Sequence, residues 1–332
     1  MLYAKDCKGK LITAHNANKY CAYKCPHCQN TVILKKGSIK TSHFAHAHRD
    51  SNFCNKGETY EHYMFKHELA QQLNKLDYHV TIEPYISQCY QYPDLIINNK
   101  FAIEIQFSNI TIDNIKKRSN GLANIGFDVI WIIGKLKYNQ RTKILFLNKC
   151  ERTYINLKKR QLFSWHSDTS ILYRYKIIQF IGGNRYIAIR EQISYKQFTY
   201  YFINSDSTKL PCHFKLTKST IKQYIKNCRR QGTVHEPSLS VIYNLQLEES
   251  WVCENLGMVY PEQIFIQSHP IYWQLQLLNM INKNKINNRV FLDIIRYNHF
   301  YNYDVNSPVI VQAIIRKFQK SCQNIGYNNV QN

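Results

Sequence analysis

The sequence predicts an α+β protein in three parts, and three observations support this. Cysteine and histidine pairs near the start have the spacing of zinc ligands, a central stretch combines helix and strand periodicities, and helical periodicity prevails towards the end. The expected domains are a zinc ribbon over residues 1–57, a mixed domain over 58–160 and a mostly helical domain over 161–332. With 332 residues, 44% of them hydrophobic, the chain can build several cores.

The first domain is predicted from the ligands that zinc requires. Two pairs with two-residue gaps flank a short strand and a turn, as in a zinc ribbon, and a further cysteine follows. Four of five candidates would bind the ion: Cys25, Cys28, His43, His46 and Cys54. Cys25 and Cys28 are the firm pair, and if residues 43–46 form a strand, opposite-facing imidazoles favour His46 with Cys54. Zinc would then supply the folding free energy of this small domain, whereas a surface loop with incidental histidines is the alternative.

A helix is predicted over residues 57–76 because apolar residues recur there at helical spacing. They form one stripe: Phe65, Leu69, Leu73 and Leu76. Glu58 and His62 fall within this stripe and Glu61 at its edge, which indicates that the stripe leads into a polar site. Alternatively, the glutamates favour the helix dipole and His62 is exposed. Lys66 is placed either to reach a phosphate or to extend along the surface.

Two strands then carry a pair of acids, Tyr92–Ile97 and Phe101–Phe107, joined by a tight polar turn. In the second strand Glu104 and Gln106 share the face opposite the apolar residues, and a buried acid there needs a cationic partner. A three-residue loop would place Asp94 directly across from Glu104, whereas a two-residue loop would not. Two converging carboxylates require a divalent cation between them, which predicts a magnesium or manganese phosphodiesterase centre. An ordinary hairpin with solvent-facing acids is the alternative.

The other elements follow from the same periodicities. Around the acid-bearing strands we expect a strand at Val80–Ile86, a helix at Ile110–Ala123 and a buried strand at Phe127–Ile133, giving the order αβββαβ. Further on we expect two strands and three helices: Ile171–Phe180, Arg185–Arg190, Lys215–Arg230, Pro261–Asn284 and Pro308–Cys322.

A formal net charge of +22 indicates a polyanionic partner, and we expect DNA in single-stranded form. The stretch Lys135–Arg160 interleaves basic and aromatic residues, which suits a single-strand groove, and its end supplies Lys158, Lys159 and Arg160 as DNA contacts. A solvated linker explains the same composition. The sequence shows no signal peptide, no long apolar run and no disulfide pattern, so we expect a cytoplasmic protein with no membrane contact and no small-molecule cofactor.

The acid-bearing strands resemble the PD-(D/E)XK nuclease superfamily. Pro93-Asp94 corresponds to its first motif, and Glu104-Ile105-Gln106 to its second, with glutamine where lysine is usual. Lysine helps to activate water and stabilise charge on the phosphate, whereas an amide orients water without supplying charge. The resemblance implies a restriction-endonuclease-like core, and the order of the predicted elements agrees with it.

A wider set of motifs, within about residues 20–134, resembles the competence protein CoiA family of naturally transformable Gram-positive bacteria. The set comprises Cys25–Cys28, His43–His46, Glu58, Glu61, His62, Lys66, Tyr92–Asp94, Ala102–Ser108, Arg118 and Val129–Ile132. That family joins a zinc-ribbon-like N-terminus to a nuclease-like domain and handles incoming single-stranded DNA and its recombination. The resemblance implies recombination or competence proteins as partners and a phosphate contact for Arg118, for which plain exposure is the alternative. Leu122 departs from the aromatic residue expected there.

The expected function is therefore that of a magnesium- or manganese-dependent nuclease. Asp94 and Glu104 would bind the metal, Gln106 would orient water, and Glu58 or Glu61 with His62 would complete the site. Alternatively, the same fold serves as a DNA-binding or recombination adaptor with little or no hydrolysis. A restriction-type defence nuclease is a third hypothesis, which requires sequence-specific cutting.

Overall fold

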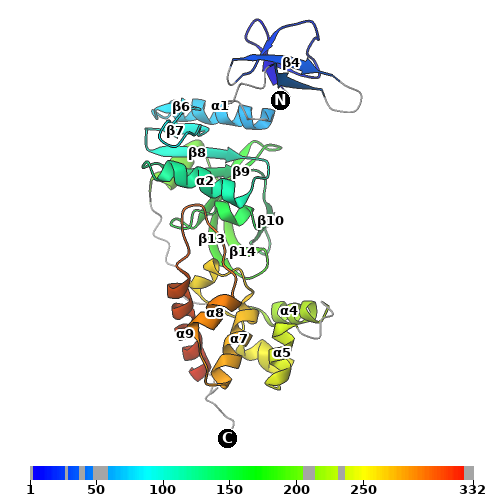
Figure 1. Ribbon diagram of the computed structural model, residues 1–332, viewed down its shortest axis with the longest axis vertical. Coiled ribbons are helices and arrows are strands. Elements are labelled where there is room, and N and C mark those ends of the chain that lie inside the picture. Colours follow the sequence, from blue (N-terminus) through cyan, green and yellow to red (C-terminus); the bar gives the residue numbers. More distant parts are fainter. Residues whose placement is uncertain are drawn as a thin grey trace. The chain divides into compact units, whose positions relative to one another are not determined.

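The computed structural model describes residues 3–26, 29–36, 42–47, 59–204, 214–230 and 236–324. These residues form a mixed α+β structure, as predicted, with two compact units (Figure 1). The first unit comprises Met1–Pro84 and Asp94–Asn98, and the second comprises Tyr85–Pro93 and Asn99–Asn332. Asp94 therefore belongs to the first unit and Glu104 to the second.

The first unit begins with a sheet of short strands in the order β2-β1-β3-β4-β5. The strands are β1 (Tyr3–Lys5), β2 (Leu11–Thr13), β3 (Tyr23–Lys24), β4 (Thr31–Lys35) and β5 (His43–His46). Burial alternates along β4, because Val32 and Leu34 face a small core while their neighbours face solvent. Phe44 and Cys25 complete this core. The core is small, as expected for a domain that needs a further source of folding free energy.

Helix α1 (Tyr60–Asn74) follows, and it begins three residues later than predicted. Thr59 caps it, since the Thr59 side chain accepts a hydrogen bond from the His62 backbone N–H at 3.3 Å. The predicted stripe is buried at Phe65, Leu69 and Leu73. Strands β6 (Val80–Ile82) and β7 (Leu95–Ile97) then pair antiparallel within this unit.

The second unit contains a mixed sheet in which the strands follow the order β10-β11-β14-β13-β12-β9-β8. Their bounds are β8 (Phe101–Gln106), β9 (Asp128–Ile133), β10 (Lys137–Asn139), β11 (Ile144–Phe146), β12 (Gln161–His166), β13 (Ile171–Phe180) and β14 (Arg185–Gln192). β9 is parallel to both β8 and β12. Because β12 pairs with β9, the sheet continues past the predicted boundary at residue 160. Strands β13 and β14, which agree with the strands predicted at Ile171–Phe180 and Arg185–Arg190, continue this sheet within the part of the chain expected to be mostly helical.

Helices flank this sheet, and the chain becomes mostly helical towards its C-terminal end (Figure 1). They are α2 (Ile112–Ala123), η1 (Glu151–Tyr154), α3 (Tyr195–Ile203), α4 (Lys218–Arg230), α5 (Pro237–Asn244), α6 (Glu249–Asn255), η2 (Pro261–Phe265), α7 (Pro270–Asn282), α8 (Asn288–Ile294) and α9 (Ser307–Asn324). A short ladder joins β15 (Phe214–Lys215) to β16 (Met258–Val259). No helix within the described ranges is long and apolar enough to cross a bilayer.

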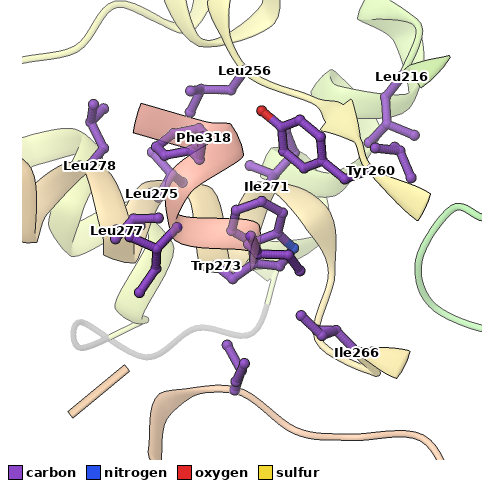
Figure 2. Close-up of a cluster of buried hydrophobic side chains, with 14 of the residues drawn as sticks. Leu216, Leu256, Tyr260, Ile266, Ile271, Trp273, Leu275, Leu277, Leu278 and Phe318 are labelled. Atoms are coloured by element: carbon purple, nitrogen blue, oxygen red, sulfur yellow. The ribbon is translucent and has the colours of Figure 1, made fainter. Parts of the chain in front are cut away.

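The helical part has its own core, centred on Trp273 (Figure 2). The Trp273 indole is fully buried, and its Nε1 donates to Gln263 Oε1 at 2.7 Å. The helix predicted over Pro261–Asn284 is in fact two elements, η2 and α7. The break occurs because the residue before Pro270, His269, is held extended, with ψ 141°.

His269 also joins the sheet to the helical core. Its Nδ1 accepts a hydrogen bond from the Ile271 N–H at 3.2 Å, and its ring stacks on Tyr224 at 4.1 Å. Gly182, with φ +98°, allows this close packing, since a Cβ there would lie 2.4 Å from the His269 Cδ2 atom. Burial lowers the pKa of His269 to about 3, and the positive charge of Arg185 acts in the same direction.

We predict that His269 makes the free energy of unfolding depend on pH. Its pKa is lower in the folded than in the unfolded chain, so the unfolded state binds the extra proton between about pH 6.5 and pH 3. Stability should fall as pH falls through this window, by up to about 1.4 kcal/mol per pH unit. Urea unfolding at several pH values should show a shallower dependence in His269→Asn, which keeps a capping acceptor. Equal pH dependences in wild type and variant would contradict the assignment.

Candidate functional site

Glu104 lies in the middle of β8 with its side chain fully buried. Arg118, from α2, donates a hydrogen bond through Nη2 to Glu104 Oε2, so a carboxylate inside the sheet has the cationic partner that its burial requires. The Arg118 guanidinium also lies over the ring of Trp131, 5.3 Å from its centroid. Trp131 is the residue opposite Glu104 in the neighbouring strand β9.

The local sequence of α2 explains how Arg118 reaches this position. Thr111 caps the helix by accepting from the Asn114 N–H at 3.3 Å. The buried face of the helix consists of Ile115, Ser119 and Leu122. Arg118 borders this face, so its stem is covered while 29% of the side chain remains exposed. Leu122, where the family resemblance leads one to expect an aromatic residue, is a core residue here.

The Trp131 ring is itself fixed. Its Nε1 donates to Ser119 Oγ at 3.0 Å, and Ser119 Oγ donates to the Ile115 carbonyl at 2.7 Å. Tyr154 packs against the ring at 5.1 Å, and burial raises the pKa of the Tyr154 hydroxyl. Glu104 and Arg118 therefore lie on a rigid, hydrogen-bonded support, as a preorganised site requires.

In the first unit, Asp94 is buried directly before β7. The His62 Nε2 atom, from the first turns of α1, lies 3.3 Å from Asp94 Oδ1. The interpretation that the apolar stripe of α1 leads into a polar site is thus supported at His62. Glu61 is exposed, and its predicted part in the site stays a prediction. Glu58 lies outside the described residues.

Gln106 ends β8 and is half-buried. Its Nε2 donates to both the carbonyl oxygen and the hydroxyl of Ser108, each at 2.9 Å. These two bonds fix the orientation of the amide plane. A fixed amide suits the predicted role of orienting a water molecule, which stays a prediction.

The connection between β7 and β8 has three residues, Asn98, Asn99 and Lys100, and the two asparagines have positive φ values of 49° and 51°. This is the loop length for which the sequence predicts facing carboxylates at positions 94 and 104. The convergence itself stays a prediction, because the two residues belong to different compact units. The structure corrects one expectation. Arg118 supplies a positive charge to Glu104, whereas the sequence led us to expect a divalent metal ion in that role.

Several residues predicted to contact DNA are engaged within the protein instead. Lys66 is buried and its Nζ donates to Glu83 at 2.6 Å, so its ammonium does not face solvent. Lys159 donates to the carbonyl oxygens of the α3 residues Tyr201 and Phe202. Arg160 is also buried, its Nη2 donates to the Ile178 carbonyl at 3.2 Å, and burial lowers its pKa to about 10.

Of the predicted basic cluster, Lys158 has its side chain exposed at the surface. The predicted single groove along Lys135–Arg160 is divided, since Tyr154 points into the core and Tyr138 lies beside Arg190 at 4.9 Å. Arg118, the remaining predicted contact, binds Glu104. In this region long cationic side chains donate hydrogen bonds to acceptors inside the protein. Composition alone does not distinguish such side chains from those that are free to contact DNA.

The predicted zinc ligands fall partly within the described chain. Cys25 is fully buried, and its N–H donates to the Asn30 carbonyl at 2.8 Å. Residues 43–46 form a strand, so the two imidazoles project to opposite faces. His46 pairs with the core residue Val32, whereas His43 pairs with exposed Lys35. The pairing of β4 with β5 therefore places His46 on the core face, which agrees with the expected preference for His46 as a zinc ligand.

Cys28 and Cys54 lie outside the described residues. Among the residues that the structure does describe, no three His, Cys, Asp or Glu side chains are grouped so that they could hold a metal ion. The zinc site therefore stays a prediction, with Cys25, His43 and His46 as the candidate ligands that the structure describes.

Comparison with known proteins agrees with this architecture of a small N-terminal domain and a nuclease-like domain. Residues 58–208 match the family model described as competence protein CoiA, nuclease-like domain. Residues 7–55 match the one described as competence protein CoiA, N-terminal domain. The chain belongs to the competence protein CoiA family.

One relative is the protein of Bacillus subtilis (strain 168) called competence protein CoiA, which is 32% identical over 114 residues. The match covers 33% of this chain and 31% of that relative, so the chain aligns with about a third of the relative's length. No solved structure matches this chain.

We predict that Arg118→Met destabilises the protein by about 3 kcal/mol, because it leaves the Glu104 carboxylate buried without its guanidinium. Glu104→Gln in the same chain should recover most of the loss, since a neutral amide needs no counter-ion. Arg141→Met, at an exposed position, is the matched control and should change little. Urea unfolding of wild type, Arg118→Met, Glu104→Gln and the double variant measures the coupling, with Arg141→Met measured beside them. If Arg118→Met and Arg141→Met cost the same, the ion pair does not support the fold.

Proposed function

We propose that this chain is a magnesium- or manganese-dependent nuclease that processes single-stranded DNA during competence-related recombination. Membership of the CoiA family, the nuclease-like domain and the net charge of +22 support the proposal. The observation that carries it is the full burial of Glu104 in β8, two residues before the fixed amide of Gln106. A buried strand does not need a carboxylate for its stability. A functional role therefore explains the carboxylate of Glu104 better than a structural one.

The available donors fit the proposed metal. Carboxylate oxygens are the hard ligands that Mg²⁺ and Mn²⁺ prefer, and Asp94 and Glu104 would supply them. When bound, such an ion stabilises charge on the phosphate and activates water. Arg118 would then share Glu104 with the metal or turn towards a phosphate oxygen, for which its planar guanidinium is suited. His62, beside Asp94, would orient that carboxylate.

A second candidate is an adaptor that binds DNA without cleaving it. The Arg118–Glu104 pair favours this candidate, because the guanidinium neutralises the acid with no metal present. In that case Glu104 holds α2 against the sheet, and the basic surface alone engages DNA. The two candidates differ in whether Glu104 is needed for chemistry or only for packing.

We predict that purified protein cleaves single-stranded DNA when Mg²⁺ or Mn²⁺ is added. Asp94→Asn and Glu104→Gln should each lower the rate by about a hundredfold or more, since even outer-shell partners of a metal cost about 10- to 100-fold. Asp168→Asn, which removes an exposed carboxylate paired with Lys135, is the matched control and should cleave normally.

The adaptor candidate would be favoured by a different pattern. Wild type would then cleave neither single- nor double-stranded DNA with either metal, and Glu104→Gln would bind DNA as tightly as wild type. Cleavage that continues unchanged in both carboxylate variants would place the chemistry elsewhere in the chain.

We also infer that the N-terminal domain holds one structural zinc ion. Metal analysis should find about one zinc per chain, and Cys25→Ser should lose it and lower the melting temperature of this domain, because the thiolate is a ligand. Cys21→Ser, at an exposed cysteine in the same domain, should keep both. Stable folding of Cys25→Ser without zinc would remove the inference.

A further inference from the structure

The second unit contains a cavity of about 290 Å³. Its walls come from α2, the start of β9, the segment from Tyr154 to the start of β12, the end of α3 and residues 300–304. These segments lie far apart in the sequence and meet only in the fold. Lys158 and Lys159, which the sequence predicts as DNA contacts, are among the lining residues.

The cavity shares a wall with the candidate site. Trp131, Tyr154 and Ser119 line it, and the same Trp131 ring lies under the guanidinium that binds Glu104. A ligand in the cavity would therefore contact the Trp131 ring, on which the Arg118 guanidinium of the Glu104–Arg118 pair lies. That position suits recognition of a substrate next to its reacting phosphate.

The C-terminal half builds one wall and holds it rigidly. The Tyr301 hydroxyl donates to the Val129 carbonyl at 3.0 Å, and the Tyr301 N–H donates to the Thr153 carbonyl at 3.0 Å. The Leu157 N–H donates to Asn302 Oδ1 at 3.3 Å. These bonds fix residues 300–304 against the nuclease-like domain, so the cavity is preformed.

The lining is rich in aromatic residues and carries charges of both signs, since Lys116, Lys158 and Lys159 lie in it together with Asp128 and Asp304. Eight lining residues have aromatic rings: Phe127, Trp131, Tyr154, Phe163, Phe202, Phe300, Tyr301 and Tyr303. Tyr303 is 38% exposed and Phe127 is half-buried, so both rings are accessible from solvent. Lys158 is exposed beside them, and the exposed polar side chains Asn120 and Asp128 can meet the edge of a ring ligand.

We propose that this cavity binds one unpaired base of a single-stranded DNA, with Lys158 on the adjoining phosphate. The volume lies at the lower end of the range for small-ligand sites, about 300–1,000 Å³, which suits a single nucleotide and excludes a duplex. Aromatic rings stack on bases of any sequence, and a lysine beside them binds the backbone. The proposal deepens the proposed function, on which it rests for the identity of the polyanion.

Binding of a short oligothymidylate, and of the same sugar–phosphate backbone without bases, tests this proposal by fluorescence anisotropy. Tyr303→Ala and Phe127→Ala should each weaken binding of the oligothymidylate by about tenfold and leave the base-free backbone unaffected. Lys158→Ala should weaken both probes by the same factor, since it acts on phosphate. The matched controls are Tyr243→Ala and Lys226→Ala, at exposed positions on α5 and α4.

The proposal is overturned if Tyr303→Ala and Phe127→Ala weaken both probes equally, or neither, while their melting temperatures match wild type. It is also overturned if wild type binds the two probes with equal affinity. The assay requires no cleavage and no metal, so a failure of the nuclease proposal does not affect it. Conversely, a wild-type protein that cleaves DNA but binds both probes with equal affinity would remove this inference alone.

Discussion

The ion pair between Glu104 and Arg118 is the constraint that connects the packing of the nuclease-like domain with its candidate chemistry. A carboxylate in the middle of a buried strand is unfavourable unless a cation compensates it, and Arg118 does so from α2. The pair fixes α2 over β8 and β9, and it places Trp131 between the acid and the neighbouring cavity. Stability and the candidate chemistry thus involve the same two charges.

The C-terminal half of the chain also contributes to the structure of the nuclease-like domain. Residues 300–304 return from the helical region to the edge of the nuclease-like sheet, where the Tyr301 hydroxyl binds the Val129 carbonyl. Arg152 adds a second bridge, since its Nη1 donates to Asn298 Oδ1 at 2.9 Å. The nuclease-like sheet and the helical core are therefore joined by buried hydrogen bonds, and the cavity that they enclose needs both.

Hydrophobic periodicity in the sequence was sufficient to predict elements that bury one face or both, such as β13, β9 and α9. It failed where a local backbone feature intervenes: β6 ends at Ile82 because Glu83 has a positive φ of 48° and Pro84 follows. Burial of Glu104 in a strand predicted the need for a cation but not its identity, because Arg118 is brought to it only by packing of α2. The partners of Lys66 and Lys159 were missed for the same reason, since long side chains choose acceptors that are distant in sequence.

We propose that Glu104, together with Asp94, holds a divalent metal ion in the active protein. Anomalous diffraction from crystals of the whole chain grown with Mn²⁺ is the decisive measurement, because it locates manganese without reference to activity. We expect a peak bound by the carboxylates of both residues, with Arg118 sharing Glu104 or released from it. Crystals in which Arg118 remains on Glu104 and no manganese lies beside either carboxylate would contradict the proposal.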